Sequence, residues 1–193
     1  MNLLLLYGTT EGQTRKITQF VADRLAKLGH QTLMVNAIDA TAEADPRGFD
    51  AVIIAASLHT GRYQSGVVHF VNQHLADIDA RPNAFLSVSL AAASDDEDDA
   101  LGLERCVIDF SQQTRWSPQR IHHVAGAFRY TSYDFFKRWA MKYIAHRKGG
   151  PTDTSEDHEL TDWADLKEFV DHFSREIESP PAPKNTRAAH PAR

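Results

Sequence analysis

The sequence has little of several features that would point to particular classes of protein. Its 193 residues include a single cysteine, Cys106, which excludes an intramolecular disulfide. No apolar run approaches the ~18 residues needed to span a bilayer, so any membrane contact would have to be peripheral. The net charge of −5 is modest and gives no indication of a nucleic-acid partner. The chain starts with an apolar segment and has no basic leader, which favours a cytoplasmic protein.

The length and the composition of the tail indicate one domain followed by a short extension. A chain of this size can bury a full hydrophobic core without disulfides or metals. Proline and basic residues dominate after Ser179, so residues 180–193 are expected to be disordered. We predict one α/β domain over residues 1–179, a Pro-rich tail and no metal site.

The first seventeen residues give the clearest local signal. Leu3 to Tyr7 form a short apolar run that is typical of a buried parallel strand. Apolar residues then recur at helical spacing from Ile17 to Leu28. Residues 9–14 therefore form a loop between the end of a strand and the beginning of a helix.

A loop in this position can bind an anion. The first N–H groups of a helix have no partners within it, and the helix dipole favours negative charge. Thr9, Thr10 and Thr14 add hydroxyl donors, and Gly12 would let a ligand approach the backbone closely. The loop has neither the lysine of a Walker A motif nor the glycines of a G-x-G-x-x-G fingerprint. Two interpretations stay open, a phosphate site and an ordinary polar turn capped by threonines.

The pattern downstream predicts a parallel sheet. Further apolar strands are expected at residues 32–36, 51–56, 85–90 and 121–128, with amphipathic helices after the first, third and fourth strands and at the end of the chain. Strands that alternate with helices indicate a doubly wound α/β fold, with the strand order 2-1-3-4-5.

In such a sheet, ligands bind outside the carboxyl ends of the strands, at the switch between strands one and three. Loops 9–14, 57–63 and 89–94 should meet there. Gly61 permits the tight turn or positive φ that the second loop would need. The candidate binding residues are Thr9, Thr10, Glu11, Gly12, Gln13, Thr14, Ser57, Leu58, His59, Thr60, Gly61, Ser89, Leu90, Ala91 and Ala92.

The phosphate loop carries a resemblance to a known family. Tyr7, Thr9, Gly12 and Thr14, placed directly after an N-terminal hydrophobic strand, resemble the flavodoxin signature. The resemblance implies a flavodoxin-like fold and FMN as the cofactor, with the FMN phosphate bound by residues 9–14.

One departure from electron-carrying flavodoxins is informative. Those proteins cover the flavin ring with aromatic side chains, whereas residues 90–93 here are one leucine and three alanines. An open ring face would let a second molecule reach the flavin, which suits an enzyme better than a carrier. His59 and Tyr63 could line the other face or lie at the surface, and the sequence leaves both alternatives open.

A long insertion separates the fifth expected strand from the last helix. Residues 129–160 far exceed the ~2 to 6 residues usual for such a connection, and long loops commonly carry function. Within the insertion, residues 133–148 combine an aromatic face with Lys137, Arg138 and Lys142. Such a helix can lie in a membrane interface or pack on its own domain, and the aromatic and basic bias favours a membrane or lipophilic partner.

The insertion sharpens the resemblance. Gly149-Gly150-x-Thr152-Asp153-Thr154 and Thr161-Asp162-Trp163, together with the phosphate loop, resemble the flavodoxin-type protoporphyrinogen oxidases, the menaquinone-dependent protoporphyrinogen IX dehydrogenase family. The resemblance implies FMN-dependent oxidation of protoporphyrinogen IX, with a porphyrinogen and a quinone as small-molecule partners, at the cytoplasmic face of the inner membrane. The alternatives are a flavodoxin-like electron carrier and an FMN-dependent quinone reductase unrelated to haem. The sequence indicates no oligomeric state.

Two features leave the substrate and the chemistry open. The acidic run 95–99 would repel the propionates of a porphyrinogen if it lined the flavin site, and it would have no such effect as a solvated loop. No catalytic acid or base stands out. His59, His122, His123 and Arg129 are candidates by location alone.

Overall fold

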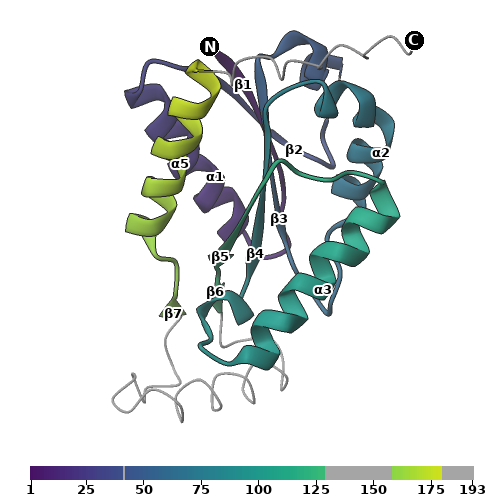
Figure 1. The fold of residues 1–193 in the computed structure, drawn as a ribbon, viewed down its shortest axis with the longest axis vertical. Helices are drawn as coiled ribbons and strands as arrows, with labels where there is room; N and C mark the ends of the chain where they lie inside the picture. Colours follow the sequence, from purple (N-terminus) through teal and green to yellow (C-terminus); the bar gives the residue numbers. More distant parts are fainter. Residues whose placement is uncertain (41, 129–157, 180–193) are drawn as a thin grey trace, which may run out of the picture.

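The computed structural model of the chain describes residues 1–40, 42–128 and 158–179, and these residues contain a parallel sheet between two layers of helices (Figure 1). The sheet has five strands in the order β2-β1-β3-β4-β5, so the predicted fold class and strand order are confirmed. The strands are β1 (Asn2–Gly8), β2 (Gln31–Asn36), β3 (Ala51–Ser57), β4 (Asn83–Ser89) and β5 (Arg120–Ala125).

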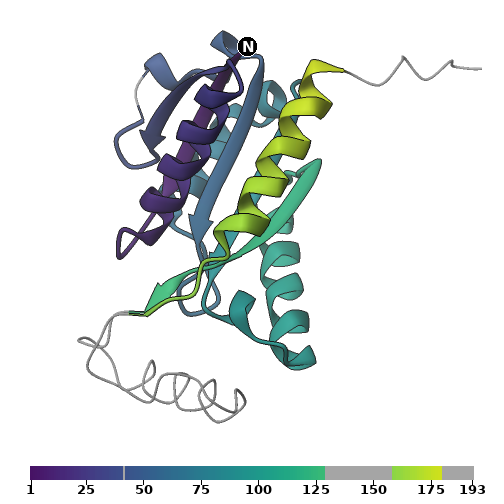
Figure 2. The same ribbon diagram turned by 90° about the vertical axis from the view of Figure 1, so that its left-hand side faces the viewer.

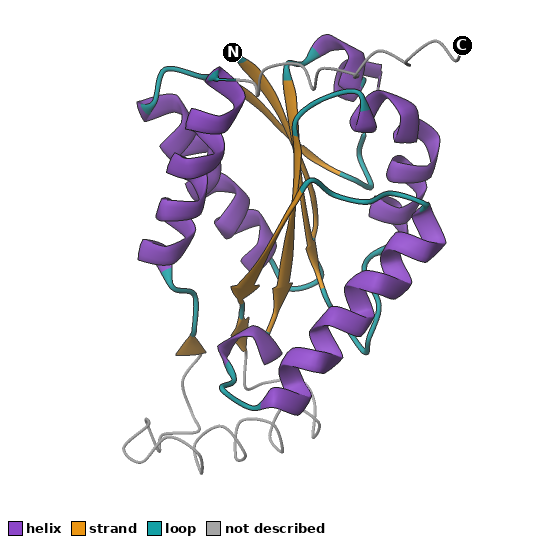
Figure 3. Cartoon of the chain, in the orientation of Figure 1, coloured by secondary structure: helices purple, strands orange, loops and turns teal. Residues whose placement is uncertain are grey.

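The helices divide between the two faces of the sheet. Helices α1 (Gln13–Lys27) and α5 (Trp163–Glu178) cover one face, side by side in Figure 2, while α2 (Ser65–Asp79) and α3 (Glu97–Thr114) cover the other face. Short 3-10 helices lie in the connections, as the cartoon in Figure 3 shows: η1 (Ala42–Ala44), η2 (Pro46–Gly48) and η3 (Ala91–Ala93).

The leucine run of β1 explains why this strand lies in the interior of the sheet. Leu3 and Leu5 pack on the side of α1 and α5, whereas Leu4 and Leu6 pack on the side of α2 and α3. All four side chains are fully buried. Burial of a leucine side chain contributes about 1.5–3 kcal/mol, so an uninterrupted apolar run is favoured only where both faces of a strand are covered.

The fifth strand differs from the prediction. The expected strand at residues 121–128 is divided at Gly126, and the chain beyond it forms β6 (Ala127–Phe128), which pairs antiparallel with β7 (His158–Glu159). The Gly126 N–H donates to the carbonyl oxygen of Ser89 at 2.9 Å, and the Gly126 carbonyl accepts from the N–H of Leu160 at 3.1 Å. Gly126 thus links the end of β4 to the segment that returns to α5.

Several sequence predictions fall on residues that the structure does not describe. The basic segment 133–148, Arg129 and the tail 180–193 lie outside the described residues. The helix expected at the end of the chain is described, and it starts at Trp163, where the Asp162 carboxylate accepts hydrogen bonds from the N–H groups of Ala164 and Asp165. Among the helices of the described ranges, none has the length and apolar character to cross a bilayer.

Candidate functional site

A pocket lies at the carboxyl ends of the central strands, where the sequence predicts a ligand site. Its walls come from the three predicted loops and from the junction of β5 and β6. The lining residues are Thr9, Thr10, Glu11, Gln13, Thr14, Ser57, Leu58, His59, Val88, Ser89, Leu90, Gly126 and Ala127. The predicted residues Gly12, Thr60, Gly61, Ala91 and Ala92 belong to the same loops but do not line this pocket.

The loop 9–14 leads into the N-terminus of α1, which has no side-chain cap. Gly12 is the N-cap residue, with φ at +92°, and its N–H donates to the Thr9 hydroxyl at 2.9 Å. No side chain caps α1, and no acidic residue lies in its first turn. The N–H groups of Gln13, Thr14 and Arg15 precede the first helical hydrogen bond, from Lys16 N–H to the Gly12 carbonyl at 3.2 Å. This helix end is therefore suited to an anion.

Thr14 distinguishes the anion site from an ordinary turn. Its side chain is fully buried and lines the pocket, and its hydroxyl oxygen has no hydrogen-bond partner in the described structure. A buried polar group without a partner costs about 1–3 kcal/mol. The turn interpretation accounts for Thr9, which accepts from Gly12, but it gives the Thr14 hydroxyl no partner, whereas a ligand in the pocket would give it one.

Gln64 was not among the predicted site residues, although it joins two of the loops. Its side-chain amide nitrogen donates to the Thr10 hydroxyl at 3.2 Å and also to the Ser57 hydroxyl, while its amide oxygen is buried without a partner in the described structure. A Cβ atom on Gly8 would lie 2.9 Å from that oxygen and 2.6 Å from the Val67 side chain. Gly8 therefore allows the start of α2 to pack closely against the end of β1.

The side chain of Gln13 ties α1 to the segment that follows the insertion. Its amide nitrogen donates to Glu159 at 2.8 Å and to the Thr161 hydroxyl at 2.9 Å, and the Lys16 ammonium pairs with Glu159 at 2.8 Å. Burial raises the pKa of the Glu159 carboxyl, but the hydrogen bonds from Lys16 and Gln13 outweigh it and hold the pKa below its usual value. The Thr161 hydroxyl donates to the carbonyl of Ala125 at 2.7 Å. Because these hydrogen bonds use the side-chain amide of Gln13, a contact from Gln13 to a ligand would come from its backbone N–H.

The loop after β3 contains a tight turn, and the loop after β4 contains a short helix. Thr60 and Gly61 have φ values of 48° and 77°, and the backbones of His59 and Arg62 exchange hydrogen bonds of 2.9 and 3.0 Å, so the positive φ expected at Gly61 is confirmed. The residues after Ser89 form η3, and the Ser89 hydroxyl accepts from the N–H of Ala92 at 3.1 Å. Among the described residues, no Phe, Tyr or Trp side chain lines the pocket.

Tyr63 neither lines the pocket nor lies at the surface, the two alternatives that the sequence left open. The side chain is buried in the core under α2 and α3, where its ring lies 5.1 Å from those of both Phe85 and Phe110. Its hydroxyl is 2.8 Å from the hydroxyl of Ser87, and burial raises the pKa of Tyr63 to about 12. The turn at residues 59–62 reverses the chain and sends the next side chain inward.

His122 and His123 were candidates for acid or base chemistry, and the structure places both away from the pocket. The His122 ring stacks on Phe169 of α5 at 4.5 Å, and its Nε2 atom lies 3.3 Å from the Asp165 carboxylate. His123 is the next residue of β5, so its side chain points to the opposite face of the sheet. Burial lowers the pKa of both imidazoles. Of the candidate histidines, His59 alone lines the pocket.

The acidic run 95–99 forms the start of α3. The Asp96 carboxylate caps this helix by accepting from the Asp98 N–H at 2.9 Å, and Glu97, Asp98 and Asp99 occupy the first turn. Acidic residues are stabilising there because they oppose the positive end of the helix dipole. None of the run lines the pocket, so direct contact between these carboxylates and a substrate in the pocket is not expected.

Comparisons with known proteins agree with this geometry. A flavodoxin-domain model matches residues 4–155. Protoporphyrinogen IX dehydrogenase (quinone) of Escherichia coli K12 is 35% identical over 177 residues, which cover 92% of this chain and 94% of that protein. The protein of the same name from Leishmania major is 32% identical, covering 97% of this chain and 81% of its own length.

Solved structures show the same fold at low identity. A short-chain flavodoxin associated with a bacterial microcompartment has a TM-score of 0.57 at 12% identity, covering 92% of this chain and 99% of its own. A Pseudomonas aeruginosa flavodoxin has a TM-score of 0.56 at 10% identity, covering 93% of this chain and 100% of its own. The chain therefore belongs to the flavodoxin-domain family and, within it, to the family of the protoporphyrinogen IX dehydrogenases (quinone).

Proposed function

We propose that this chain oxidises protoporphyrinogen IX with bound FMN and passes the electrons to a quinone. The observation that carries the proposal is the 35% identity over 92% of the chain to a protein named for this reaction. That likeness extends far beyond the phosphate loop, which many flavin-binding proteins share. A relative of the same name from a distant organism covers 97% of the chain and supports the same activity.

The phosphate of FMN fits the start of α1. The backbone N–H groups of the first turn and the Thr14 hydroxyl would donate to its oxygens, and Gln64 would hold Thr10 and Ser57 in place beside it. When bound, FMN supplies the acceptance and release of electrons, while the protein positions it and controls access to it.

The composition of the pocket favours an enzyme over an electron carrier. The loop after β4 contributes Leu90 and a short alanine helix, and the described residues that line the pocket include no Phe, Tyr or Trp. Small side chains leave room for a second molecule beside the flavin ring. The pocket would accept the porphyrinogen and the quinone in turn, because each must exchange electrons with the same flavin.

The insertion is the part of the chain best suited to contact a membrane. Its residues 133–148 lie outside the described structure, and the proposal rests on their aromatic and basic composition alone. A quinone partitions into the bilayer, so an enzyme that reduces it benefits from peripheral contact with the membrane surface. We place the protein at the cytoplasmic face of the inner membrane on this basis.

A direct assay tests the reaction. The FMN-loaded protein is mixed anaerobically with protoporphyrinogen IX, and a quinone is then added, while porphyrin fluorescence and flavin absorbance are followed. We expect flavin bleaching and porphyrin fluorescence to rise together, and the quinone to restore the oxidised flavin. A flavin that the quinone reoxidises but the porphyrinogen does not reduce would indicate a quinone reductase instead. Exchange of electrons with protein partners alone would indicate a carrier.

Thr14→Val should weaken FMN binding without harming the fold. Valine has the shape of threonine but removes the hydroxyl that would donate to the phosphate, a charge-assisted hydrogen bond of roughly 1.5–3 kcal/mol, or about 10- to 150-fold in Kd. The thermal unfolding midpoint of the FMN-free protein should stay level or rise, because this hydroxyl has no partner in the described structure. Quenching of flavin fluorescence during titration measures the Kd.

Thr18→Val is the matched control. Thr18 lies one turn further along α1, is equally buried, and donates its hydroxyl to the Thr14 carbonyl at 2.8 Å. Its replacement should lower stability and leave FMN affinity unchanged, the opposite pair of effects. An unchanged Kd in Thr14→Val would remove this hydroxyl from the phosphate site.

A further inference from the structure

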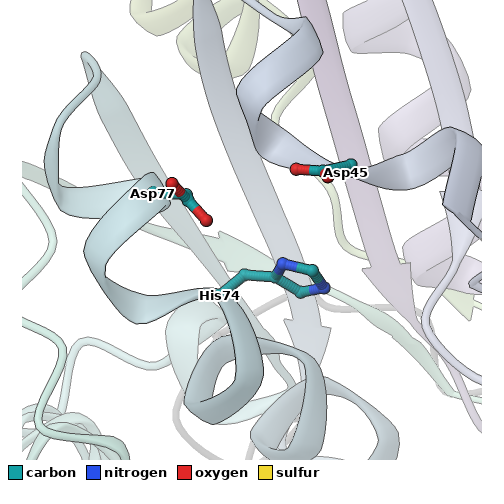
Figure 4. A group of neighbouring side chains, drawn as sticks. All are labelled: Asp45, His74 and Asp77. Atoms are coloured by element: carbon teal, nitrogen blue, oxygen red, sulfur yellow. The ribbon is translucent and has the colours of Figure 1, made fainter.

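Three side chains that can ligate metals meet at the end of the sheet opposite the flavin pocket. Asp45 caps η2, in the connection that precedes β3, and His74 and Asp77 lie in the last turns of α2. Figure 4 shows the Asp45 and Asp77 carboxylates and the His74 imidazole gathered between these two elements. The flavin pocket lies beyond the far ends of the same strands, so this cluster plays no part in it.

The geometry of the cluster approaches that of a metal site. One ligand atom from each of the three side chains can be chosen so that all lie within 4.8 Å of one another, and each residue is half-buried. Ligand atoms at about 2.1 Å from a tetrahedrally coordinated ion lie about 3.4 Å apart, so side-chain rotations that bring them closer by up to ~1.4 Å would complete the site. His74 lies at a kink in α2, with φ at −116° and ψ at 18°, and Figure 4 shows its imidazole and the Asp77 carboxylate near Asp45.

The charges of the cluster leave room for a cation. The Arg47 guanidinium donates to both Asp45 carboxylate oxygens, from Nε at 3.0 and 2.9 Å. The Arg47 side chain is 71% exposed, so it can turn into solvent and release Asp45. In the described structure, neither the Asp77 carboxylate nor the His74 imidazole has a hydrogen-bond partner.

A neighbouring arginine holds the backbone of the cluster without using these ligands. The Arg81 guanidinium donates to the carbonyl oxygens of Asp77, Phe49 and Arg47, at 2.6, 2.9 and 3.2 Å. It therefore fixes the end of α2 against the chain around η2 without occupying either carboxylate. The site is positioned before any ion binds.

We propose that Asp45, His74 and Asp77 bind a divalent transition-metal ion of the zinc type. Two carboxylates and one imidazole suit such an ion, and three protein ligands leave a fourth position for water. The ion would link the connection between β2 and β3 to α2, so its effect is stabilisation of the domain. The sequence gives no sign of this site because Asp45 stands 29 positions before His74 and the three residues form no metal-binding motif.

Calorimetric titration of the chelator-treated, FMN-loaded full chain with zinc tests the proposal. We expect one ion per chain and a rise in the thermal unfolding midpoint. His74→Gln and Asp77→Asn should each weaken zinc binding at least ~10-fold and abolish the thermal shift, since each removes a ligand. Arg47→Ala should strengthen binding, because it removes the cation that competes for Asp45.

The control is His69→Gln, which removes an exposed histidine from the same helix. It should bind zinc like the unmodified protein. Equal zinc affinity in His74→Gln and the unmodified chain, or no saturable binding by the unmodified chain, would overturn the proposal. FMN content is measured in parallel and should be the same in all variants, so the result does not depend on the proposed enzymatic activity.

Discussion

Gly12→Val is expected to release FMN from a protein that still folds. Gly12 holds a φ of +92°, a conformation that costs a residue with a side chain roughly 1–2 kcal/mol and a β-branched one more. A side chain at this position would also project into open space, since nothing lies within 4 Å of a Cβ built on Gly12. Gly12 is the N-cap residue of α1, so we expect a side chain there to obstruct access to the N–H groups of the first turn. The strain lowers the stability of the fold, whereas the added side chain acts on FMN binding, and we expect a loss of affinity of ~100-fold or more.

Gly29→Val separates the effect on the ligand from the effect on the fold. Gly29 follows the other end of α1, has a φ of +89°, and likewise has open space around its Cβ position. The backbone strain should therefore be similar in the two variants, and so should the fall in thermal unfolding midpoint. Only Gly12→Val should lose FMN on gel filtration. Retention of FMN by Gly12→Val, or its loss from both variants, would show that the loop 9–14 is not the phosphate site.

The sheet could be predicted because the apolar sequence of a strand indicates that both of its faces are buried. A parallel strand covered on both faces must be apolar throughout, as Leu3 to Leu6 are, and few other elements of this length have that pattern. The division of the fifth strand could not be predicted in the same way. Residues 121–128 read as one apolar run, but β6 pairs with β7, about 30 residues further along the chain. Local periodicity contains no information about such a partner.

The candidate site could be placed by topology, and its side chains only in part. The rule that ligands bind at the carboxyl ends of parallel strands located all three loops. The direction of each side chain depends on the path of the loop, which is why Tyr63 lies in the core and Gln64, next to it, reaches Thr10. Val88, Gly126 and Ala127 were missed because they carry no polar group that marks a site.

The sequence around the acidic run 95–99 has the pattern of a helix N-terminus, although no helix start was predicted there. Ser94 and Asp96 stand before a helical pattern, and acidic residues follow, an arrangement typical of a helix N-terminus. The structure has this arrangement, with Asp96 as the cap of α3. Considered as a helix start, the run has a structural role that requires no contact with a ligand.

Charge reversal in the basic segment 133–148 of the insertion is expected to have a large effect on membrane adsorption. Lys137, Arg138 and Lys142 lie outside the described residues, so the prediction rests on composition alone. Each cation near an anionic membrane contributes about 1 kcal/mol to adsorption. Lys137→Glu, Arg138→Glu and Lys142→Glu combined should therefore weaken binding to vesicles that contain anionic lipid by ~100-fold or more, and the difference should shrink as salt screens the charges.

Sedimentation with vesicles measures this adsorption. The control is a charge reversal outside the insertion, which tests whether any loss of positive charge has the same effect. Arg105→Glu and Arg115→Glu change exposed cations of α3 and its C-cap and should leave vesicle binding largely intact. FMN content should be the same in all variants, because the phosphate loop is untouched.

Trp139→Ala should slow turnover with a membrane-embedded quinone through loss of apolar contact, while turnover with a water-soluble quinone is retained. If vesicle binding and quinone turnover both survive every change in the segment, it packs on its own domain, and the enzyme must meet its quinone by another surface.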